Sequence, residues 1–487
     1  MPADRSPTQR VTFFFDSTAK GTAMVVMKFG GTSVGNAEAI RRVCDIISSR
    51  MPRRPVVVTS AVGGITNKLV RLSRLAGGRE KEQTAELVAE IVAQHEQIIA
   101  ELGIGDDPTF SSAFQTGKEM LQAAVNDILA NGELNDEQSD ALISTGEFFM
   151  ANILPAVLNR MGIASAMADS RKLLLTDSTF SAARPIFDES KERVQAIILP
   201  MVKQGIVPIL QGFIGSDREG RTTTLGRGGS DYSATLVGAM LGVSTVEIWS
   251  DVDGVLTADP SLVQEARRIR HMSFHEAAEL AYFGAKVLHP ATLAPAVEHN
   301  MTVVVLNSMN PDFAGTAIST SPLDPLHEGR VKSIAYKENL TVITVISSRM
   351  LMAHGFMARL FSVFDEYQTA VDLVSTSEVT LSLTIDSTKN LPNIIPQLEK
   401  FAQVRVEEKK AIVCLVGEGL KRTKGIPGQI FGLLQDTHIY LISQGASEIN
   451  LSFVVDEHDL PRVIPRLHRY FFSNEHNAHV PAPDRTL

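Results

Sequence analysis

Residues 25–47 read VVMKFGGTSVGNAEAIRRVCDII, and this stretch sets the expected fold. Its apolar start predicts a buried strand, the pair Gly30 and Gly31 predicts a tight turn, and the apolar positions that follow recur at helical spacing. Such a turn can point backbone N–H groups at an anion, and Lys28 adds a positive charge at the strand end. An ordinary strand–helix turn needs the same glycines, so the stretch alone leaves both interpretations open.

Short apolar runs of the same kind alternate with helical patterns from residue 24 to residue 309, as in PVVVTS, GIVPILQGF, VEIWSD and TVVVLN. Near-continuous apolar strands between helices indicate an α/β domain with a mostly parallel sheet sandwiched by helices. Between residues 67 and 161 the pattern is mainly helical, which predicts a helical lobe beside the sheet.

The C-terminal part contains an internal repeat. Residues 376–386 (TSEVTLSLTID) match residues 446–456 (ASEINLSFVVD) at an offset of 70 residues, and each copy reads strand, helix, strand, strand, helix. This pattern predicts two α+β ferredoxin-like modules. We therefore expect a disordered leader (1–23), an α/β domain (24–309), a linker (310–330), a first module (331–402), a second module (403–475) and a disordered tail (476–487).

Composition excludes several classes of protein. The formal net charge of −9 is spread along the chain, which argues against a nucleic-acid partner. Cys44 and Cys414 are the two cysteines; they suit a reducing compartment and exclude cysteine-based metal clusters. No apolar run approaches the roughly 18 to 20 residues of a membrane-spanning helix. We expect a cytoplasmic protein with no membrane contact.

A second glycine-rich stretch lies at residues 212–242, GFIGSDREGRTTTLGRGGSDYSATLVGAMLG. Gly228 and Gly229 lead into a predicted helix whose first turn holds Asp231, so this helix start also suits an anion, while Asp231 could meet a cation or an ammonium group. Plain capping of the helix would use the same residues. Neither stretch is a GxxxxGK[ST] phosphate loop or a strict GxGxxG dinucleotide turn.

Six motifs together closely resemble the aspartate kinases of the amino-acid kinase family: KFGGTSVGN, SAVGGITN, STGEF, QGFIGSDREGRTTTLGRGGSDYSA, SDVDGVLTADP and EAAELAYFGAKVLHPATLAPA. The resemblance runs from about residue 24 to residue 472, and the repeat resembles the paired ACT regulatory modules of these enzymes. It implies transfer of the γ-phosphoryl group of ATP to the β-carboxylate of L-aspartate, with Mg²⁺ accompanying ATP. The product, 4-phospho-L-aspartate, would lead toward lysine, threonine and methionine.

The resemblance also implies residue roles. The catalytic residues would be Lys28 and Asp231; the substrate contacts Ser60, Thr66, Glu147 and Arg227; and the ATP contacts Lys28, Gly30, Gly31, Ser250, Asp251 and Lys286. No protein metal ligand is assigned. Leu256 and Ser261 stand where a tyrosine and an arginine occur in bacterial lysine-sensitive relatives, so a stacking or phosphate contact from these positions is not expected.

STSEV is similar to the lysine-inhibited forms, so the resemblance implies feedback inhibition by lysine. The implied lysine contacts are Met350, Gly355, Phe356, Val371, Asp372, Thr376, Ser377 and Glu378. Met352 replaces a histidine of one bacterial branch. Strand edges in the modules suggest a homodimer or homotetramer formed through the ACT modules.

Two alternatives remain at this point. A kinase for another carboxylate, such as that of glutamate, is disfavoured by the regulatory pair. A sensing protein with an inert kinase half would be expected to lack Lys28, Arg227 or Asp231, and all three are present.

Overall fold

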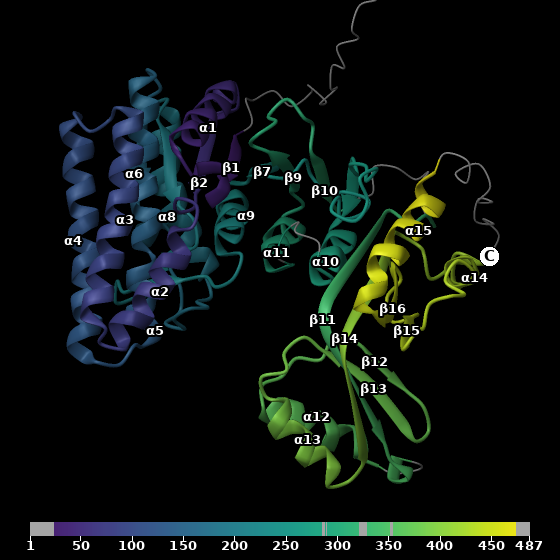
Figure 1. The fold of residues 1–487 in the computed structure, drawn as a ribbon. Coiled ribbons are helices and arrows are strands. Elements are labelled where there is room, and N and C mark those ends of the chain that lie inside the picture. Colours follow the sequence, from purple (N-terminus) through teal and green to yellow (C-terminus); the bar gives the residue numbers. More distant parts are fainter. Residues whose placement is uncertain (1–23, 285–287, 289, 321–328, 351–353, 474–487) are drawn as a thin grey trace, which may run out of the picture.

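The computed structural model describes residues 24–284, 288, 290–320, 329–350 and 354–473. The expected leader and tail lie outside these residues. The N-terminal part, called the kinase part after the family that it resembles, holds an eight-stranded sheet. The C-terminal part, called the regulatory part after the modules that are expected there, holds a six-stranded sheet (Figure 1). A further pair, β5 (Ile214–Ser216) and β6 (Thr222–Thr224), forms a small hairpin.

The sheet of the kinase part is mostly parallel, as the continuous apolar strands predict. Its spatial order is β3 (Ser165–Ala168), β4 (Val207–Gln211), β2 (Pro55–Thr59), β1 (Val25–Phe29), β7 (Thr245–Ser250), β9 (Thr302–Asn307), β10 (Thr316–Ser319) and β8 (His271–Ser273). All neighbours are parallel except β9 and β10, which are antiparallel. Strand β10 falls inside the expected linker at 310–330, so the kinase sheet extends further along the chain than the sequence pattern indicated.

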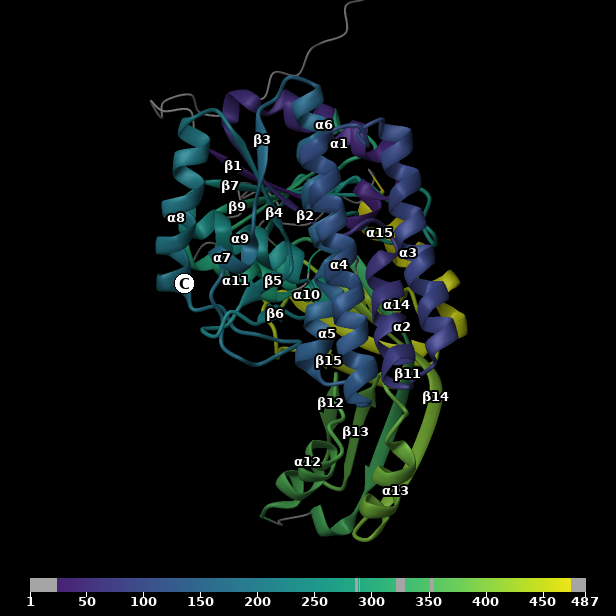
Figure 2. The same ribbon diagram turned by 90° about the vertical axis from the view of Figure 1, so that its left-hand side faces the viewer.

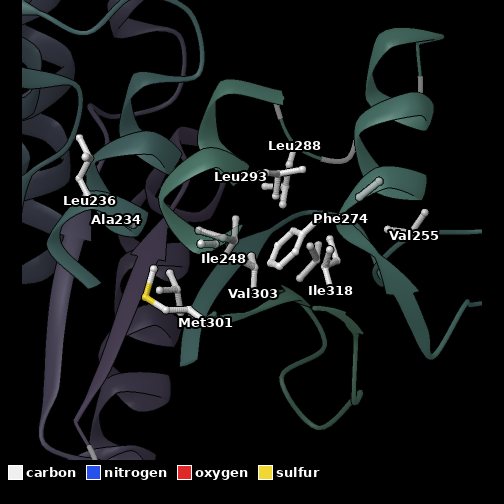
Figure 3. Packing of buried hydrophobic residues seen from close by; sticks show 14 of the residues in the cluster. Ala234, Leu236, Ile248, Val255, Phe274, Leu288, Leu293, Met301, Val303 and Ile318 are labelled. Carbon is white, nitrogen blue, oxygen red and sulfur yellow. The ribbon is translucent and has the colours of Figure 1, made fainter. Parts of the chain in front are cut away.

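Helices cover both faces of this sheet because its strands are apolar on both sides. Along β1, Val25, Met27 and Phe29 face one core and Val26 faces the other. The first core contains α1 (Ala37–Ser49), α2 (Ile65–Gly77), α3 (Lys81–Leu102), α4 (Pro108–Asn131), α5 (Asp136–Ile143) and α6 (Thr145–Arg160). The second contains α7 (Ser170–Leu173), α8 (Phe187–Lys203), α9 (Gly229–Leu241), α10 (Phe274–Tyr282) and α11 (Pro290–Glu298). Figure 3 shows Phe274, Ile318 and Val303 meeting in this second core.

The predicted helical lobe is present as α2 to α6, which stand in front of the sheet in Figure 2. Its most apolar stretch, Asp136–Arg160, is long enough to cross a membrane, but 83% of its most apolar window is buried inside the protein. Burial of this kind is typical of a core helix in a globular protein.

The regulatory sheet is antiparallel, with the order β12 (Val374–Thr376), β13 (Thr380–Ile385), β11 (Ser333–Ile346), β14 (Gln403–Val416), β16 (Asn450–Asp456) and β15 (Leu441–Gln444). Helices α12 (Phe356–Glu366) and α13 (Leu391–Glu399) pack on the first module, and α14 (Ile426–Gly432) and α15 (Leu460–Phe472) pack on the second. Helices α12 and α13 lie at the end of this part that is far from the kinase part (Figures 1 and 2).

The two modules interlock through the long strands β11 and β14. Residues 333–337 of β11 pair with residues 412–416 of β14 beside β16, whereas residues 342–346 pair with residues 403–407 and with β13. The second module thus includes the first strand segment of the region, and the pairing crosses the expected division between residues 402 and 403. A single boundary in the sequence cannot describe this arrangement, because β11 and β14 each contribute residues to both modules.

Candidate active site

A pocket of about 440 Å³ opens beyond the carboxyl ends of β1 and β2. The chain passes from β1 to β2 on one side and later returns to β7 on the other side of β1, and such a switch point is where open α/β sheets bind ligands. The lining residues are Lys28, Gly31, Thr32, Ser60, Ala61, Val62, Gly63, Gly64, Thr66, Asn67, Glu147, Phe213, Gly228, Gly229, Ser230 and Asp231.

An ion pair joins the two glycine-rich stretches inside this pocket. Lys28 Nζ at the end of β1 lies 2.5 Å from Asp231 Oδ1 in the first turn of α9, and their side chains are 11% and 19% exposed. Lys28 is the one lysine or arginine among the described residues that line the pocket. Asp231 therefore fixes the position of the cation that a phosphate group would meet.

Two helices begin at the pocket with glycine N-caps. Gly64 precedes α2 with φ of 83°, Gly228 precedes α9 with φ of 74°, and neither helix start has a side chain bound to its first N–H groups. The unpaired N–H groups and the positive end of each helix dipole favour an anion at this place.

The glycine turns approach one another too closely for side chains. A Cβ atom on Gly31 would lie 3.2 Å from the carbonyl oxygen of Ala61, and one on Gly63 would lie 3.1 Å from the carbonyl oxygen of Gly31. Glycine at these positions leaves room for a ligand to reach the backbone.

Glu147 is a buried carboxyl group with spare hydrogen-bonding capacity. It lies on α6 and is 3% exposed; Oε1 accepts a hydrogen bond from the backbone N–H of Ala61 at 3.3 Å, while Oε2 is buried without a partner. Burial raises the pKa of Glu147 to about 7. An unpaired, buried carboxyl oxygen in a pocket is ready to receive an ammonium group.

Phe213 was not singled out from the sequence. Its φ of 73° is unusual for an aromatic residue, and its N–H donates to Ser233 Oγ at 2.8 Å, which holds the backbone in this conformation. A Cβ atom on Gly229 would lie 2.5 Å from the Phe213 ring, so this glycine lets the ring lie against the start of α9. The further polar lining residues that sequence reasoning missed are Thr32 and Asn67. The motifs contained both of them, but their side chains carry no charge to mark them.

The pocket brings together six of the predicted site residues: Lys28, Gly31, Ser60, Thr66, Glu147 and Asp231. Two others differ from expectation. The N–H of Gly30 donates to the carbonyl oxygen of Trp249 at 3.2 Å, so it is not directed at a ligand. Arg227 is exposed and stands outside the pocket lining. Lys286 lies outside the described residues.

Ser250 is the last residue of β7, the strand beside β1, and Asp251 follows it; neither residue lines the pocket. The carbonyl oxygen of Ser250 accepts hydrogen bonds from the N–H and the Oγ of Ser308, at 2.8 and 2.9 Å, and Asp251 is exposed. The Leu256 carbonyl oxygen accepts from Ser333 Oγ of β11, and Ser261 Oγ donates to the nearby Asp259.

The predicted effector residues divide into two groups. Met350, Phe356 and Val371 are half-buried against the core of the first module, and Gly355 is the glycine N-cap of α12. The exposed group comprises Thr376, Ser377 and Glu378 at the turn between β12 and β13. Met352 lies outside the described residues.

Asp372 is already paired within the chain. Its Oδ1 accepts from Lys337 Nζ at 2.8 Å and from the Tyr282 hydroxyl at 3.0 Å, and its side chain is 4% exposed. Asp372 thus already meets an ammonium group of its own chain, while its Oδ2 is buried without a partner, and its contact with lysine stays a prediction.

The second module differs at the matching acid. Glu448 corresponds to Glu378, and it pairs with Lys421 at 2.9 Å and with Arg422 at 3.2 Å. The carboxylate of Glu448 in the second module is thus paired with cations of the chain itself, whereas Glu378 in the first module is exposed.

The chain is similar to known proteins along most of its length. The model of the amino acid kinase family matches residues 23–307, and an ACT domain model matches residues 413–471. The chain is 36% identical to lysine-sensitive aspartokinase 3 of Escherichia coli over 92% of this chain and 99% of that one. It is 34% identical to the chloroplastic aspartokinase 2 of Arabidopsis thaliana, covering 94% and 86% of the two chains.

Two solved structures are similar over nearly the whole chain. Both are of E. coli aspartokinase III, at 36% identity, with 92% of this chain and 100% of that chain covered. The complex with aspartate and ADP, described as the R-state, has a TM-score of 0.79, and the complex with lysine and aspartate, described as the T-state, has a TM-score of 0.80.

Proposed function

The chain belongs to the aspartokinases of the amino acid kinase family, and on this premise we propose which of its residues bind aspartate, ATP and an inhibitor. Its activity is that of an aspartate kinase, which phosphorylates aspartate with a nucleoside triphosphate as the phosphoryl donor. The observation that carries the residue assignments is the Lys28–Asp231 pair, enclosed between two glycine-capped helix starts.

The transfer step needs charge stabilisation more than a base. A β-carboxylate oxygen of aspartate, ionised at neutral pH, attacks the γ-phosphorus of ATP, and the bond from that phosphorus to the β–γ bridging oxygen breaks, leaving ADP with the electron pair. Lys28 offsets the repulsion between the two anions, and Asp231 holds the Lys28 ammonium group in place.

Aspartate would be held by groups of both signs. Glu147 would bind the α-ammonium group through its unpartnered Oε2, and Ser60 and Thr66 would donate hydrogen bonds from the pocket wall. Arg227 would bind the α-carboxylate after turning inward from its exposed position, since its planar guanidinium group matches a carboxylate.

ATP would bind beside aspartate, with its phosphates over Gly31 and its nucleoside toward Ser250 and Asp251. Among the described lining residues, the carboxylates are Asp231, which is paired with Lys28, and Glu147, whose pKa is raised by burial. Mg²⁺ would therefore arrive on the ATP phosphates, and no protein carboxylate is assigned to it. When bound, Mg²⁺ would neutralise negative charge on the ATP phosphates.

Lysine is the proposed feedback inhibitor, acting at the first module. The support is the exposed Glu378 and the glycine N-cap of α12 in the same module, together with the similarity to a lysine-sensitive relative. Glu378 would take the side-chain ammonium group, and the start of α12 would take the carboxylate. Threonine lacks a second ammonium group and would leave Glu378 unpaired.

We further propose a homodimer or homotetramer formed through the ACT modules, in the cytoplasm. The edge strand β12 carries the exposed Val374, and α12 carries the exposed Met357 and Phe361. An unpaired edge beside exposed apolar side chains is suited to pair with a second copy.

Inhibition of the purified enzyme by lysine and by threonine tests the regulatory part of this proposal. Lysine should inhibit the wild type selectively, and Glu378→Ala should weaken that inhibition about tenfold or more, since a charged hydrogen bond is worth about 1.5–3 kcal/mol. Glu448→Ala is the matched control, because Glu448 is paired internally, and it should leave inhibition unchanged. Stronger inhibition by threonine, or full lysine sensitivity in Glu378→Ala, would contradict the proposal.

A further inference from the structure

Residues 251–269 connect the end of β7 to β8 and form a loop that enters the regulatory part. The two arms of this loop pair, with Thr257 N–H donating to the Arg267 carbonyl and Ile269 N–H donating to the Val255 carbonyl, both at 2.8 Å. At its far end, Ala258 and Val263 are buried in the core of the second module. The loop therefore belongs to two parts of the protein at once.

Four hydrogen bonds fasten this loop to the second module. Ser333 Oγ donates to the Leu256 carbonyl at 2.9 Å, Ile334 N–H donates to the Thr257 carbonyl at 2.9 Å, and the Tyr336 hydroxyl donates to Asp259 Oδ2 at 3.3 Å. The fourth joins two side chains, Thr257 Oγ1 and His468 Nε2, at 2.8 Å. Because it links side chains alone, it can be removed without changing the backbone.

The Thr257 hydroxyl takes part in two hydrogen bonds. Its Oγ1 accepts from the Arg267 N–H at 2.9 Å, and it bonds His468 Nε2 as donor or acceptor according to the tautomer of the ring. Thr257 and His468 are 7% and 5% exposed, and Phe472 stacks on the imidazole at 4.6 Å between ring centroids. Burial also lowers the pKa of His468, which favours the neutral ring. A buried, oriented hydrogen bond of this kind fixes the position of its two elements.

The segment between this hydrogen bond and the end of β7 is held by further contacts. Asn307 Nδ2 donates to Asp253 Oδ1 at 2.8 Å, Gly254 has a φ of 106°, and Val255 N–H donates to Thr316 Oγ1 at 2.9 Å. Consecutive residues of this segment are thus held in place. A displacement at Thr257 would be passed to the residues that follow β7.

We propose that Thr257 and His468 are positioning residues for ATP, so that α15 of the second module holds the nucleotide side of the active site in its binding geometry. The inference rests on the proposed nucleotide role of Ser250 and Asp251. It assigns to the second module a task different from effector binding, which the first module would perform.

Steady-state kinetics of Thr257→Val test this inference, because valine keeps the side-chain shape and removes the hydroxyl group. Valine removes both the bond to His468 and the bond from the Arg267 N–H, so the KM for ATP should rise by at least about threefold, the loss expected for one buried hydrogen bond. The KM for aspartate should change less than about twofold, since a general loss of structure would raise both constants. Thr257→Ser is the matched control, because it retains the hydroxyl group, and it should keep the KM for ATP near the wild-type value.

His468→Leu and the double variant Thr257→Val/His468→Leu complete the cycle. If the two side chains act through their mutual bond, the double variant should raise the KM for ATP no more than Thr257→Val alone. Additive effects, or an unchanged KM for ATP in Thr257→Val, would overturn the inference. Should His468→Leu not fold, His468→Phe, which keeps an aromatic ring against Phe472, takes its place in the cycle, because valine at position 257 alone does not separate the bond to His468 from the bond to the Arg267 N–H.

Asp251→Ala separates this inference from the function it rests on. A raised KM for ATP in Asp251→Ala with an unchanged value in Thr257→Val would reject the positioning role alone. An unchanged KM for ATP in Asp251→Ala would reject the proposed nucleotide side and the inference with it.

Discussion

Glu147→Gln should remove a pH dependence from aspartate binding. The carboxyl group is buried and its pKa is raised to about 7, so at pH 7 it is about half ionised before substrate arrives. An ammonium group needs the ionised form. In the wild type, kcat/KM for aspartate should therefore fall about tenfold between its plateau and pH 6, because the ionised fraction falls by that factor.

The glutamine variant keeps the side-chain volume and cannot ionise. Its kcat/KM for aspartate should be about 10- to 100-fold lower on the plateau, the cost of one charged hydrogen bond, and should lack the wild-type fall between about pH 8 and pH 6. ADP release at varied aspartate and saturating ATP measures both. A flat wild-type profile, or the same slope in Glu147→Gln, would refute the assignment of the ammonium contact to this residue.

The stability of the ligand-free protein should change with pH in the direction opposite to aspartate binding: it should fall as pH rises. The folded pKa of Glu147 lies above the ordinary value of 4.5, so the folded state holds the proton more tightly than the unfolded state, and stability is lost as pH rises from 4.5 through about 7. The shift corresponds to about 3 kcal/mol as an upper bound. Ligand-free Glu147→Gln should therefore melt at a higher temperature than the wild type at pH 8, and at a similar temperature below pH 4.5.

Three further substitutions test separate parts of the account. Arg227→Lys should raise the KM for aspartate much more than that for ATP, since lysine keeps the charge but loses the two-donor fork; an unchanged KM for aspartate would count against this role. Gly229→Ala would place a Cβ atom 2.5 Å from the Phe213 ring, so kcat/KM should fall and stability should drop by about 1–3 kcal/mol, as denaturant unfolding would show. Glu276→Gln would leave Lys332 as an unpaired buried cation in place of an ion pair at 2.8 Å; the expected loss of about 3–5 kcal/mol should lower the melting temperature, and an unaltered melting curve would disprove it.

The periodicity of the sequence predicted much of the fold. Continuous apolar strands such as residues 25–29 indicated the parallel sheet, because such strands must be buried on both faces. The interlocked modules were not predicted, since the pairing of residues 333–337 with residues 412–416 joins positions far apart in sequence. No local pattern reports which half of a long strand meets which neighbour.

The site was predictable where charge and glycine coincide, as at Lys28 and Asp231. The site was less predictable where the backbone conformation of a residue matters. In the sequence Phe213 looks like an ordinary apolar residue, because its left-handed backbone is set by tertiary contacts. The partner of Asp372 could not be foreseen either, because Lys337 and Tyr282 approach it from different elements of the chain.

The most direct test of the central claim is ADP release by the purified enzyme with aspartate and with glutamate, for the wild type and for Lys28→Ala. Lys203→Ala serves as the control, because Lys203 is an exposed lysine on α8, outside the pocket lining. We expect turnover of aspartate and not of glutamate, a loss of about 100- to 1,000-fold in Lys28→Ala at unchanged folding, and wild-type rates in the control. Preference for glutamate, or near wild-type ADP release by folded Lys28→Ala, would contradict the account.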